Sequence, residues 1–312
     1  MPTSSVLGEL PLVGAGGEPV LLSRTLASHG VASLPPSRID EETWTLEVTL
    51  PLLRTGARTV RVGPERDAHA RVELHGPSVG EGSRAHLFAQ LRHMFRLDED
   101  LSPFYSVARE DEQLGWAVTG AGRMLRSPTV FEDVVKTICT TNTAWGGTVR
   151  MVGGLVDHLG AKAPTGAHAF PTPGAIADAP DEFFRDVART GYRGPYIRTL
   201  AMSVASGQLD LEQLNDPELP DEEVEQRLLE LPGVGPYAAA HVMLTSLGRY
   251  SRLVLDSWTR PAYAKLVGRK TSDKAIERRF RRYGDFAGLA FWLLLTRGWV
   301  PDDAASGGSA AI

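Results

Sequence analysis

A short glycine turn between two helical stretches constrains the fold of this chain more than any other segment. Residues 231–235 read Leu-Pro-Gly-Val-Gly. Pro232 and Gly233 interrupt the preceding helical pattern, and Gly235 permits a backbone that other residues would strain. Pro236 suits the first position of a new helix, because the N–H that proline lacks would be unpaired there. The segment therefore predicts two helices joined by a hairpin whose outer face carries no obstructing side chain.

Such a hairpin can bind an anion through its bare backbone amides. The N-terminus of the second helix adds a dipole that favours negative charge. A DNA phosphate is the expected anion, while a plain connection between helices is the alternative that the turn alone leaves open.

An acid among apolar neighbours follows the second predicted helix. Asp256 comes after Leu-Val-Leu at 253–255 and precedes Trp258. One role for its carboxylate is to cap a helix that begins near Ser257. The other role is chemical, because burial raises the pKa of a carboxyl group while helix amides lower it, so that the acid can stay ionised in a dry cavity. There it could stabilise a cationic sugar and orient or deprotonate water.

The first third of the chain has the period-two pattern of strands. Residues 43–50, 58–62 and 70–74 alternate apolar and polar side chains, and Gly-Pro pairs at Gly63 and Gly76 punctuate them. This pattern predicts an antiparallel sheet with one covered face.

Helical spacing begins near Ser83 and continues almost to the C-terminus. Ser127 and Pro128 predict the N-cap and first turn of one helix, and residues 286–295 predict a buried helix too short to span a membrane. The expected fold is α+β, with an N-terminal antiparallel β domain at 1–82, a mostly α-helical core at 83–300 and a disordered tail at 301–312.

Composition excludes several classes of site. Cys139 is the only cysteine, which excludes disulfides, a cysteine-ligated iron–sulfur cluster and thiolate-rich zinc sites, and the eight histidines lack metal-ligand spacing. The N-terminus lacks the basic region of a signal peptide, so we expect a cytoplasmic protein. The formal net charge is −5, yet residues 268–282 carry seven basic side chains against two acidic ones. A solvated helix face and a phosphate-facing patch both remain open for that segment.

Several stretches in the same order resemble the helix-hairpin-helix DNA glycosylase superfamily. The hairpin is followed by an acid 19 residues beyond position 237, as in that family. Residues 131–160 and 191–201 are similar to segments of its 8-oxoguanine DNA glycosylase branch, and 169–173 and 284–295 to bacterial 3-methyladenine relatives. The resemblance covers roughly residues 85–300 and implies a two-lobed glycosylase core, with the hairpin at 229–237, after an appended antiparallel domain.

The resemblance also implies an activity and a set of partners. A member of this family excises damaged bases in base excision repair: it flips an alkylated or oxidised purine out of double-stranded DNA and breaks its N-glycosidic bond. We accordingly expect a monomer associated with the nucleoid in a bacterial-type cytoplasm, with no membrane partner and no required cofactor. The resemblance leaves open which damaged base is excised.

Individual roles follow from the same match. Asp256 corresponds to the catalytic aspartate. Asn142 corresponds to the residue that fills the gap opposite the flipped base, and Tyr192 and Arg193 correspond to the wedge beside it. The remaining DNA contacts are expected at the hairpin residues Leu231, Gly233, Val234, Gly235 and Tyr237, and a structural K⁺ or Na⁺ at the backbone carbonyls of Leu229, Leu231 and Val234.

One departure from the family bears on the reaction. Bifunctional members have a lysine at the position of Tyr237, and tyrosine cannot form a Schiff base with the sugar. The five lysines all lie outside the hairpin, and Lys136 is expected on a solvated surface. The resemblance therefore favours a monofunctional, water-using enzyme. Tyr237, Trp145 and Trp258 are candidates to line the base pocket, with core packing as the alternative.

A non-catalytic DNA-binding protein with the same hairpin is the competing hypothesis. Asp256 separates the two, because a pure binding module has no use for an acid in an apolar setting beside a phosphate site.

Overall fold

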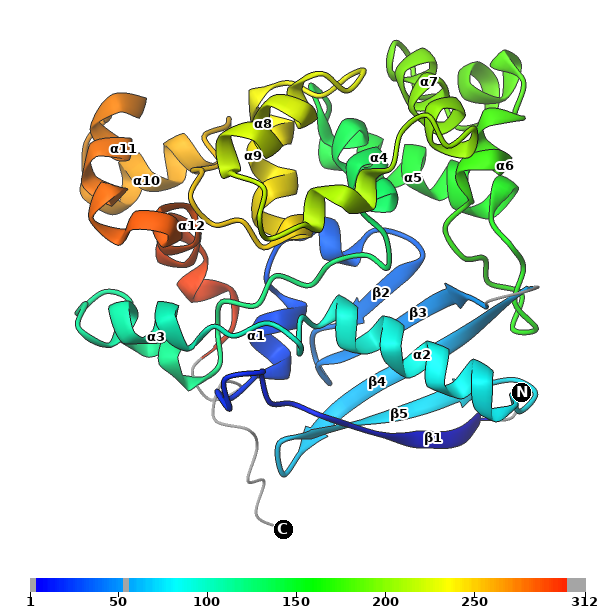
Figure 1. The fold of residues 1–312 in the computed structure, drawn as a ribbon, viewed down its shortest axis with the longest axis horizontal. Helices are drawn as coiled ribbons and strands as arrows, with labels where there is room; N and C mark the ends of the chain where they lie inside the picture. The colour runs from blue at the N-terminus through cyan, green and yellow to red at the C-terminus, as the bar shows by residue number, and fades with distance from the viewer. Residues whose placement is uncertain (1–3, 53–55, 302–312) are drawn as a thin grey trace.

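A five-stranded antiparallel sheet forms the N-terminal part of the molecule and helices form the rest (Figure 1). The structure, a computed structural model, describes residues 4–52 and 56–301. The strands are β1 (Ser4–Pro11), β2 (Ser37–Asp40), β3 (Thr45–Pro51), β4 (Ala57–Arg66) and β5 (His69–His75), in the order β1-β5-β4-β3-β2. The α+β prediction is confirmed.

Helix α2 (Glu81–Met94) packs on one face of the sheet. Its Leu87, Leu91 and Met94 are buried in one cluster with inward-facing strand residues such as Leu46 and Val48. The period-two pattern of the strands and the 3.6-residue pattern of the helix therefore meet in a shared apolar layer.

The sheet differs from the sequence expectation in three ways. Strands β1 and β2 were not predicted, and β4 does not stop at Gly63 but continues through a register shift between Val62 and Glu65. The second face is also partly covered, because the hydroxyl of Thr59 bonds both Thr49 (3.0 Å) and Thr165 (2.7 Å). The loop that carries Thr165 lies over that face, so the prediction of a single covered face was wrong.

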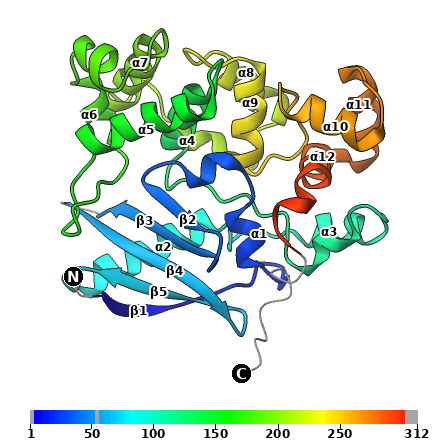
Figure 2. The same cartoon turned by 180° about the vertical axis from the view of Figure 1, so that it is seen from behind.

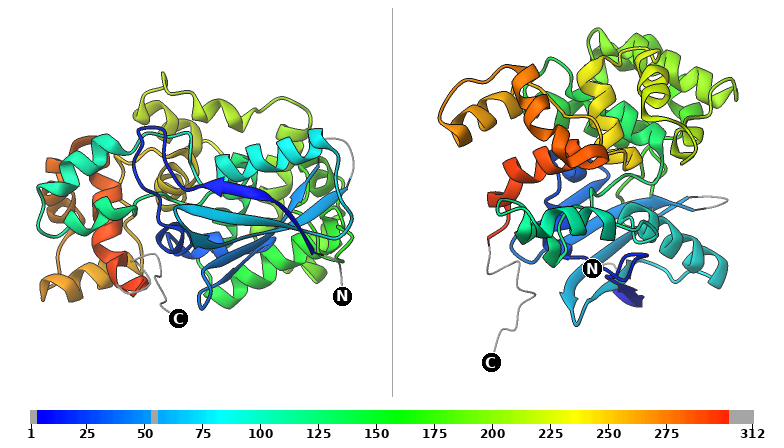
Figure 3. Two further views of the ribbon diagram at one scale, coloured as in Figure 1. Left: turned by 90° about the horizontal axis from the view of Figure 1, so that it is seen from below. Right: turned by 60° about the vertical axis from the view of Figure 1, so that its left-hand side comes forward.

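The helices divide into two packed clusters beside the sheet (Figure 2). Seen from below, the sheet with α2 lies toward one end of the molecule and α10–α12 at the other (Figure 3). The remaining α-helices are α1 (Leu22–Leu26), α3 (Ser102–Arg109), α4 (Val130–Thr140), α5 (Trp145–Leu159), α6 (Pro173–Ala177), α7 (Arg193–Ala205), α8 (Asp221–Leu229), α9 (Pro236–Val242), α10 (Thr259–Val267), α11 (Asp273–Phe280) and α12 (Ala287–Thr296).

Helix α9 joins the two clusters. Its Ala239 and Val242 pack with α4, α5, α7 and α8, whereas Ala240 packs with α3 and α10–α12. The helix continues as a π-helical turn, Met243–Leu247, and Gly248 ends it in the left-handed region (φ 69°), where glycine is unstrained. The hairpin at the start of α9 therefore lies where the two clusters meet, and Tyr237 packs against both.

The N-cap of α4 differs from the prediction, and the predicted tail lies almost entirely outside the described residues. Thr129, not Ser127, caps α4, because its hydroxyl accepts the Glu132 amide (3.2 Å) while the Ser127 amide donates to Asp133. Apart from Pro301, the predicted tail at 301–312 lies outside the described residues. None of the helices in the described ranges combines the length and apolar character that a membrane crossing requires.

Candidate active site

The hairpin between α8 and α9 presents an open backbone. Gly233 has φ 81°, and a Cβ at this position would lie 2.9 Å from Cδ2 of Tyr196, so both the backbone and the space demand glycine. Gly235 has an ordinary extended backbone (φ −108°), so the expectation that another residue would be strained there was wrong. A Cβ on Gly235 would meet nothing within 4 Å, so the backbone on that side of the turn is uncovered. The amide of Val234 closes the turn on the Leu231 carbonyl (3.1 Å). An anion can therefore approach the turn without displacing a side chain.

The turn is anchored to the protein core by its two apolar side chains. Leu231 and Val234 are buried in the first helical cluster, while the side chain of Leu229 is exposed. Packing thus fixes the segment that carries the three carbonyls predicted to bind a monovalent cation. Among the described residues, no group of three or more His, Cys, Asp and Glu side chains is arranged to hold a metal ion.

Asp256 lies just before α10 and is half-buried. Its Oδ1 accepts hydrogen bonds from the amides of Trp258 (2.8 Å) and Thr259 (2.6 Å), and its own amide donates to the Thr259 hydroxyl (2.9 Å). The capping role is therefore present in the structure. Within the described residues, however, Oδ2 makes no hydrogen bond, so one carboxylate oxygen is held and the other is free. Capping and chemistry are compatible roles for this acid.

Tyr237 links the hairpin to the acid. It is the second residue of α9, is half-buried against both helical clusters, and bonds the Thr140 hydroxyl (3.2 Å). Burial raises the pKa of Tyr237, the Thr140 bond opposes this, and the negative charge of Asp256 adds to the rise. The carboxylate and the hairpin helix are therefore close enough to interact.

Two buried histidines continue the site inward from Tyr237. The ring of His241 lies 5.8 Å from Tyr237 and 5.8 Å from His29, centroid to centroid. Burial lowers the pKa of His29 to about 4 and that of His241 to about 3, so both rings are neutral at pH 7. Nε2 of His29 donates to the Leu125 carbonyl (2.7 Å), and its Nδ1 is buried without a partner. The floor of the site is thus uncharged.

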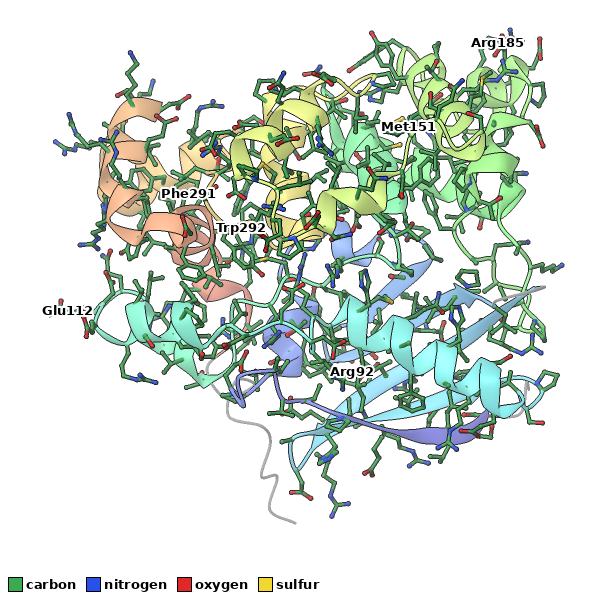
Figure 4. All side chains as sticks on the ribbon, in the orientation of Figure 1. Arg92, Glu112, Met151, Arg185, Phe291 and Trp292 are labelled. Atoms are coloured by element: carbon green, nitrogen blue, oxygen red, sulfur yellow. The ribbon has the colours of Figure 1, made fainter. Side chains whose placement is uncertain are left out.

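Three tryptophans form the wall near the acid. Trp292, which Figure 4 labels on α12, lies 6.4 Å from His241 and 5.6 Å from Trp258. The ring of Trp258 also lies 5.4 Å from that of Trp299, tilted by 57°, and Trp258 is 40% exposed. Trp145 is 48% exposed at the start of α5, where its ring lies over Gly30. The structure therefore brings Trp258 and Tyr237 together through His241 and Trp292, and no ring contact connects Trp145 to this group within the described residues.

Asn142 and Tyr192 are paired at the surface. Nδ2 of Asn142 donates to the Tyr192 hydroxyl (3.2 Å), and both side chains are exposed, Tyr192 by 53%. Asn142 has φ 46°, a left-handed conformation that asparagine tolerates better than most residues. Tyr196 lies 6.3 Å from Tyr192, ring to ring, and packs on Gly233. This contact places the predicted gap-filling and wedge residues beside the hairpin.

Arg193 does not have the position expected of a wedge. Its side chain is buried, and Nε donates to the Thr141 carbonyl (3.1 Å). Nη2 donates to the same carbonyl, and the guanidinium lies over the Tyr192 ring at 4.5 Å. Arg193 thus holds the loop and the ring that carry Asn142 and Tyr192, and of the two predicted wedge residues only Tyr192 is exposed.

Lys136 is not on a solvated surface, so that expectation was wrong. Its side chain is 2% exposed, and Nζ lies 2.7 Å from Oε1 of Glu132 and 3.2 Å from the Ser127 hydroxyl. A lysine and a glutamate four residues apart share one face of a helix, and here that face is the buried one.

Sequence reasoning missed Tyr196, His29, His241 and Trp292. His241 follows Tyr237 by four residues on one helix face, so the i, i+4 rule could have found it. His29 and Trp292 come from distant segments, and only the packing brings them together.

Comparisons with known proteins find DNA glycosylases among the sequence relatives and the structural neighbours. No family model matches the chain. A "Probable N-glycosylase/DNA lyase" of Methanothermobacter thermautotrophicus is 24% identical over 64% of this chain and 70% of its own length. An N-glycosylase/DNA lyase of Arabidopsis thaliana is 31% identical over 58% of this chain, which spans about half (53%) of that relative. The solved 3-methyladenine DNA glycosylase of Archaeoglobus fulgidus covers 94% of this chain and 100% of its own, with a TM-score of 0.71 at 21% identity.

Proposed function

We propose that this chain is a monofunctional glycosylase of the helix-hairpin-helix DNA glycosylase superfamily, which flips a damaged purine out of duplex DNA and hydrolyses its N-glycosidic bond. The observation that carries the proposal is the carboxylate of Asp256 beside the hairpin helix, in which Oδ1 accepts two backbone hydrogen bonds and Oδ2 accepts none from the described part of the chain. Double-stranded DNA with an alkylated or oxidised base is the proposed partner, and the cytoplasm is the proposed location.

The reaction breaks the bond between C1′ and the base nitrogen, and the bonding electrons leave with the base. Positive charge develops on the sugar as this happens, and a fixed carboxylate stabilises it. Oδ1 of Asp256 is held by the amides of Trp258 and Thr259, which leaves Oδ2 for the sugar or for water. Water then adds to C1′ and gives a proton to Oδ2 of Asp256, and a purine that leaves as an anion takes up a proton at the freed nitrogen, so no covalent enzyme intermediate forms.

The hairpin would hold the phosphate backbone near the flipped nucleotide. The open amides at Gly233 and Gly235 suit a phosphate oxygen. We propose that the carbonyls of Leu229, Leu231 and Val234 hold K⁺ or Na⁺ there, because the packed side chains at 231 and 234 fix the turn. The ion would supply positive charge near the phosphate.

The decisive experiment is a panel of duplexes that each contain one modified base. Free base release, followed by alkali treatment to reveal abasic sites, would identify the substrate class among alkylated, oxidised and deaminated purines. Release from at least one lesion supports the enzyme. Binding without release across the whole panel would instead favour the non-catalytic DNA-binding alternative.

Asn142 gives a prediction about base flipping. Replacing Asn142 by glycine keeps the left-handed backbone (φ 46°) and removes the side chain. We expect base release from a paired lesion to slow by about tenfold, because nothing then fills the gap opposite the flipped base. The same variant should be close to wild type on a lesion placed in a mismatch, which needs less energy to flip. Equal slowing on both substrates would contradict the gap-filling role.

Borohydride trapping tests the absence of lyase chemistry. The wild-type protein should give no trapped adduct with lesion-bearing DNA, because Tyr237 cannot form a Schiff base and the amine of Lys136 is buried against Glu132. Tyr237→Lys places an amine at the hairpin helix and should yield an adduct, which makes it the positive control. A covalent adduct with the wild-type chain would show that the enzyme is bifunctional.

A further inference from the structure

The basic segment at 268–282 forms a concave site that the proposed chemistry does not use. A pocket of about 250 Å³ lies between α10 and α11, and Arg269, Arg278 and Arg279 line it together with Tyr263 and Thr271. Val267 and Ala275 complete its lining, so no acidic side chain lines it. The pocket therefore offers three guanidinium groups and two hydroxyls to a ligand.

The charges of this pocket are not neutralised within the protein. Arg269 and Arg278 form no ion pair with any acid in the described ranges, and both are exposed. Asp273 is engaged elsewhere, because both its oxygens bond Arg260 at 2.9 Å. Unpaired like charges around one cavity repel each other, and an anion that enters relieves this repulsion.

Arg279 is held in place and so preorganises the site. Its Nη1 donates to the Tyr263 hydroxyl (2.9 Å) and its Nη2 to Oε1 of Gln113 (2.9 Å). The guanidinium also lies 5.6 Å from the Tyr263 ring centroid and 5.8 Å from that of Phe280. A fixed, planar guanidinium suits a phosphate better than a freely moving ammonium does.

The position of the pocket relates it to the hairpin. In Figures 1 and 2, α10 and α11 lie along the same edge of the molecule as α7, α8 and α9. Figure 4 shows nitrogen-tipped side chains projecting outward from this end of the edge. A polyanion that contacts the hairpin could therefore extend to α11. The whole chain has a formal net charge of −5 and so does not attract DNA overall. Contacts with a polyanion therefore depend on local clusters of basic side chains such as this one.

We propose that the Arg269–Arg278–Arg279 pocket binds a backbone phosphate of the duplex flank, as a second anchor beyond the hairpin. This inference rests on the proposed function, because it assumes duplex DNA along that edge. The anchor contacts no base, so it strengthens binding on damaged and undamaged duplexes alike.

The test measures binding of undamaged duplex as a function of salt for Arg269→Gln/Arg278→Gln. We expect severalfold weaker binding, and a slope of log affinity against log salt that is smaller by about one phosphate contact. Arg66→Gln is the control for the loss of an exposed arginine elsewhere, because Arg66 lies in the β4–β5 hairpin and not on this edge. It should keep the wild-type affinity within about twofold and the wild-type slope.

Duplexes shortened from one end or from the other show which flank contacts the pocket. The difference between wild type and the double variant should disappear when one flank is removed, and persist when the other is removed. Equal affinity and slope for wild type and the double variant would overturn the proposal, as would an equal loss in Arg66→Gln or a difference insensitive to both flanks. If the wild type released no base but the pocket variant lost binding, the glycosylase proposal would fail and the anchor would stand.

Discussion

Replacing Asp256 by asparagine is expected to slow base release by about a hundredfold to a thousandfold while leaving duplex binding within about twofold. The loss is electrostatic, because the amide has the size of the carboxylate but not the charge that stabilises the cationic sugar. Asparagine is as good a helix cap as aspartate, so its side-chain oxygen can still accept the amides of Trp258 and Thr259. Single-turnover base release with enzyme in excess measures the chemical step directly.

Asp256→Ala separates the two roles of this residue. Alanine removes the charge and also the two capping bonds, so it should match asparagine in lost activity but lose about 1 kcal/mol more stability. If Asp256→Asn released base at the wild-type rate, the carboxylate would be only a helix cap and the proposed mechanism would be wrong.

The hairpin, strands β3–β5 and helix α2 could be predicted from the sequence, because each depends on residues that are close together in the chain. Proline at 232 and 236 restricts the backbone, and glycine at 233 permits the left-handed conformation of the turn, so the hairpin could be predicted without tertiary information. Apolar and polar side chains alternate with a period of two residues in β3–β5, and the apolar side chains of α2 recur with the 3.6-residue period of a helix. Both periods can be recognised within a single short segment. Strand β1 escaped prediction because most of its residues are not buried, which leaves no clear alternation to read.

The parts of the site that sequence could not predict depend on packing between distant segments. His29 comes from the N-terminal part, His241 from α9 and Trp292 from α12, and no local pattern relates them. The same limit explains the error at Arg193, because its position in the matched segment says nothing of the Thr141 carbonyl that holds it. A motif identifies a residue type at a position, whereas its neighbours decide whether the side chain reaches solvent.

The side chain of Lys136 was expected in solvent, but its neighbours bury it in an ion pair. Its ammonium and the Glu132 carboxylate form an ion pair in which the lysine side chain is 2% and the glutamate side chain 6% exposed. Desolvation raises the pKa of Glu132, and the charge of Lys136 opposes that rise. Lys136→Met should therefore destabilise the fold by about 3–5 kcal/mol, because it leaves a buried carboxyl group without its counter-charge. The midpoint of urea unfolding measures the change.

The pH dependence and a double variant test the cause of that loss. In Lys136→Met the folded-state pKa of Glu132 rises further above its unfolded value, so the stability from this group is present at low pH and is lost as pH increases through the folded pKa. The variant should consequently lie closer to wild type near pH 5 than near pH 8. Glu132→Gln/Lys136→Met removes the stranded charge and should recover much of the stability. A double variant as unstable as Lys136→Met would instead assign the loss to packing of the lysine stem against its neighbours, among them Phe170, whose ring centroid lies 5.8 Å from Nζ.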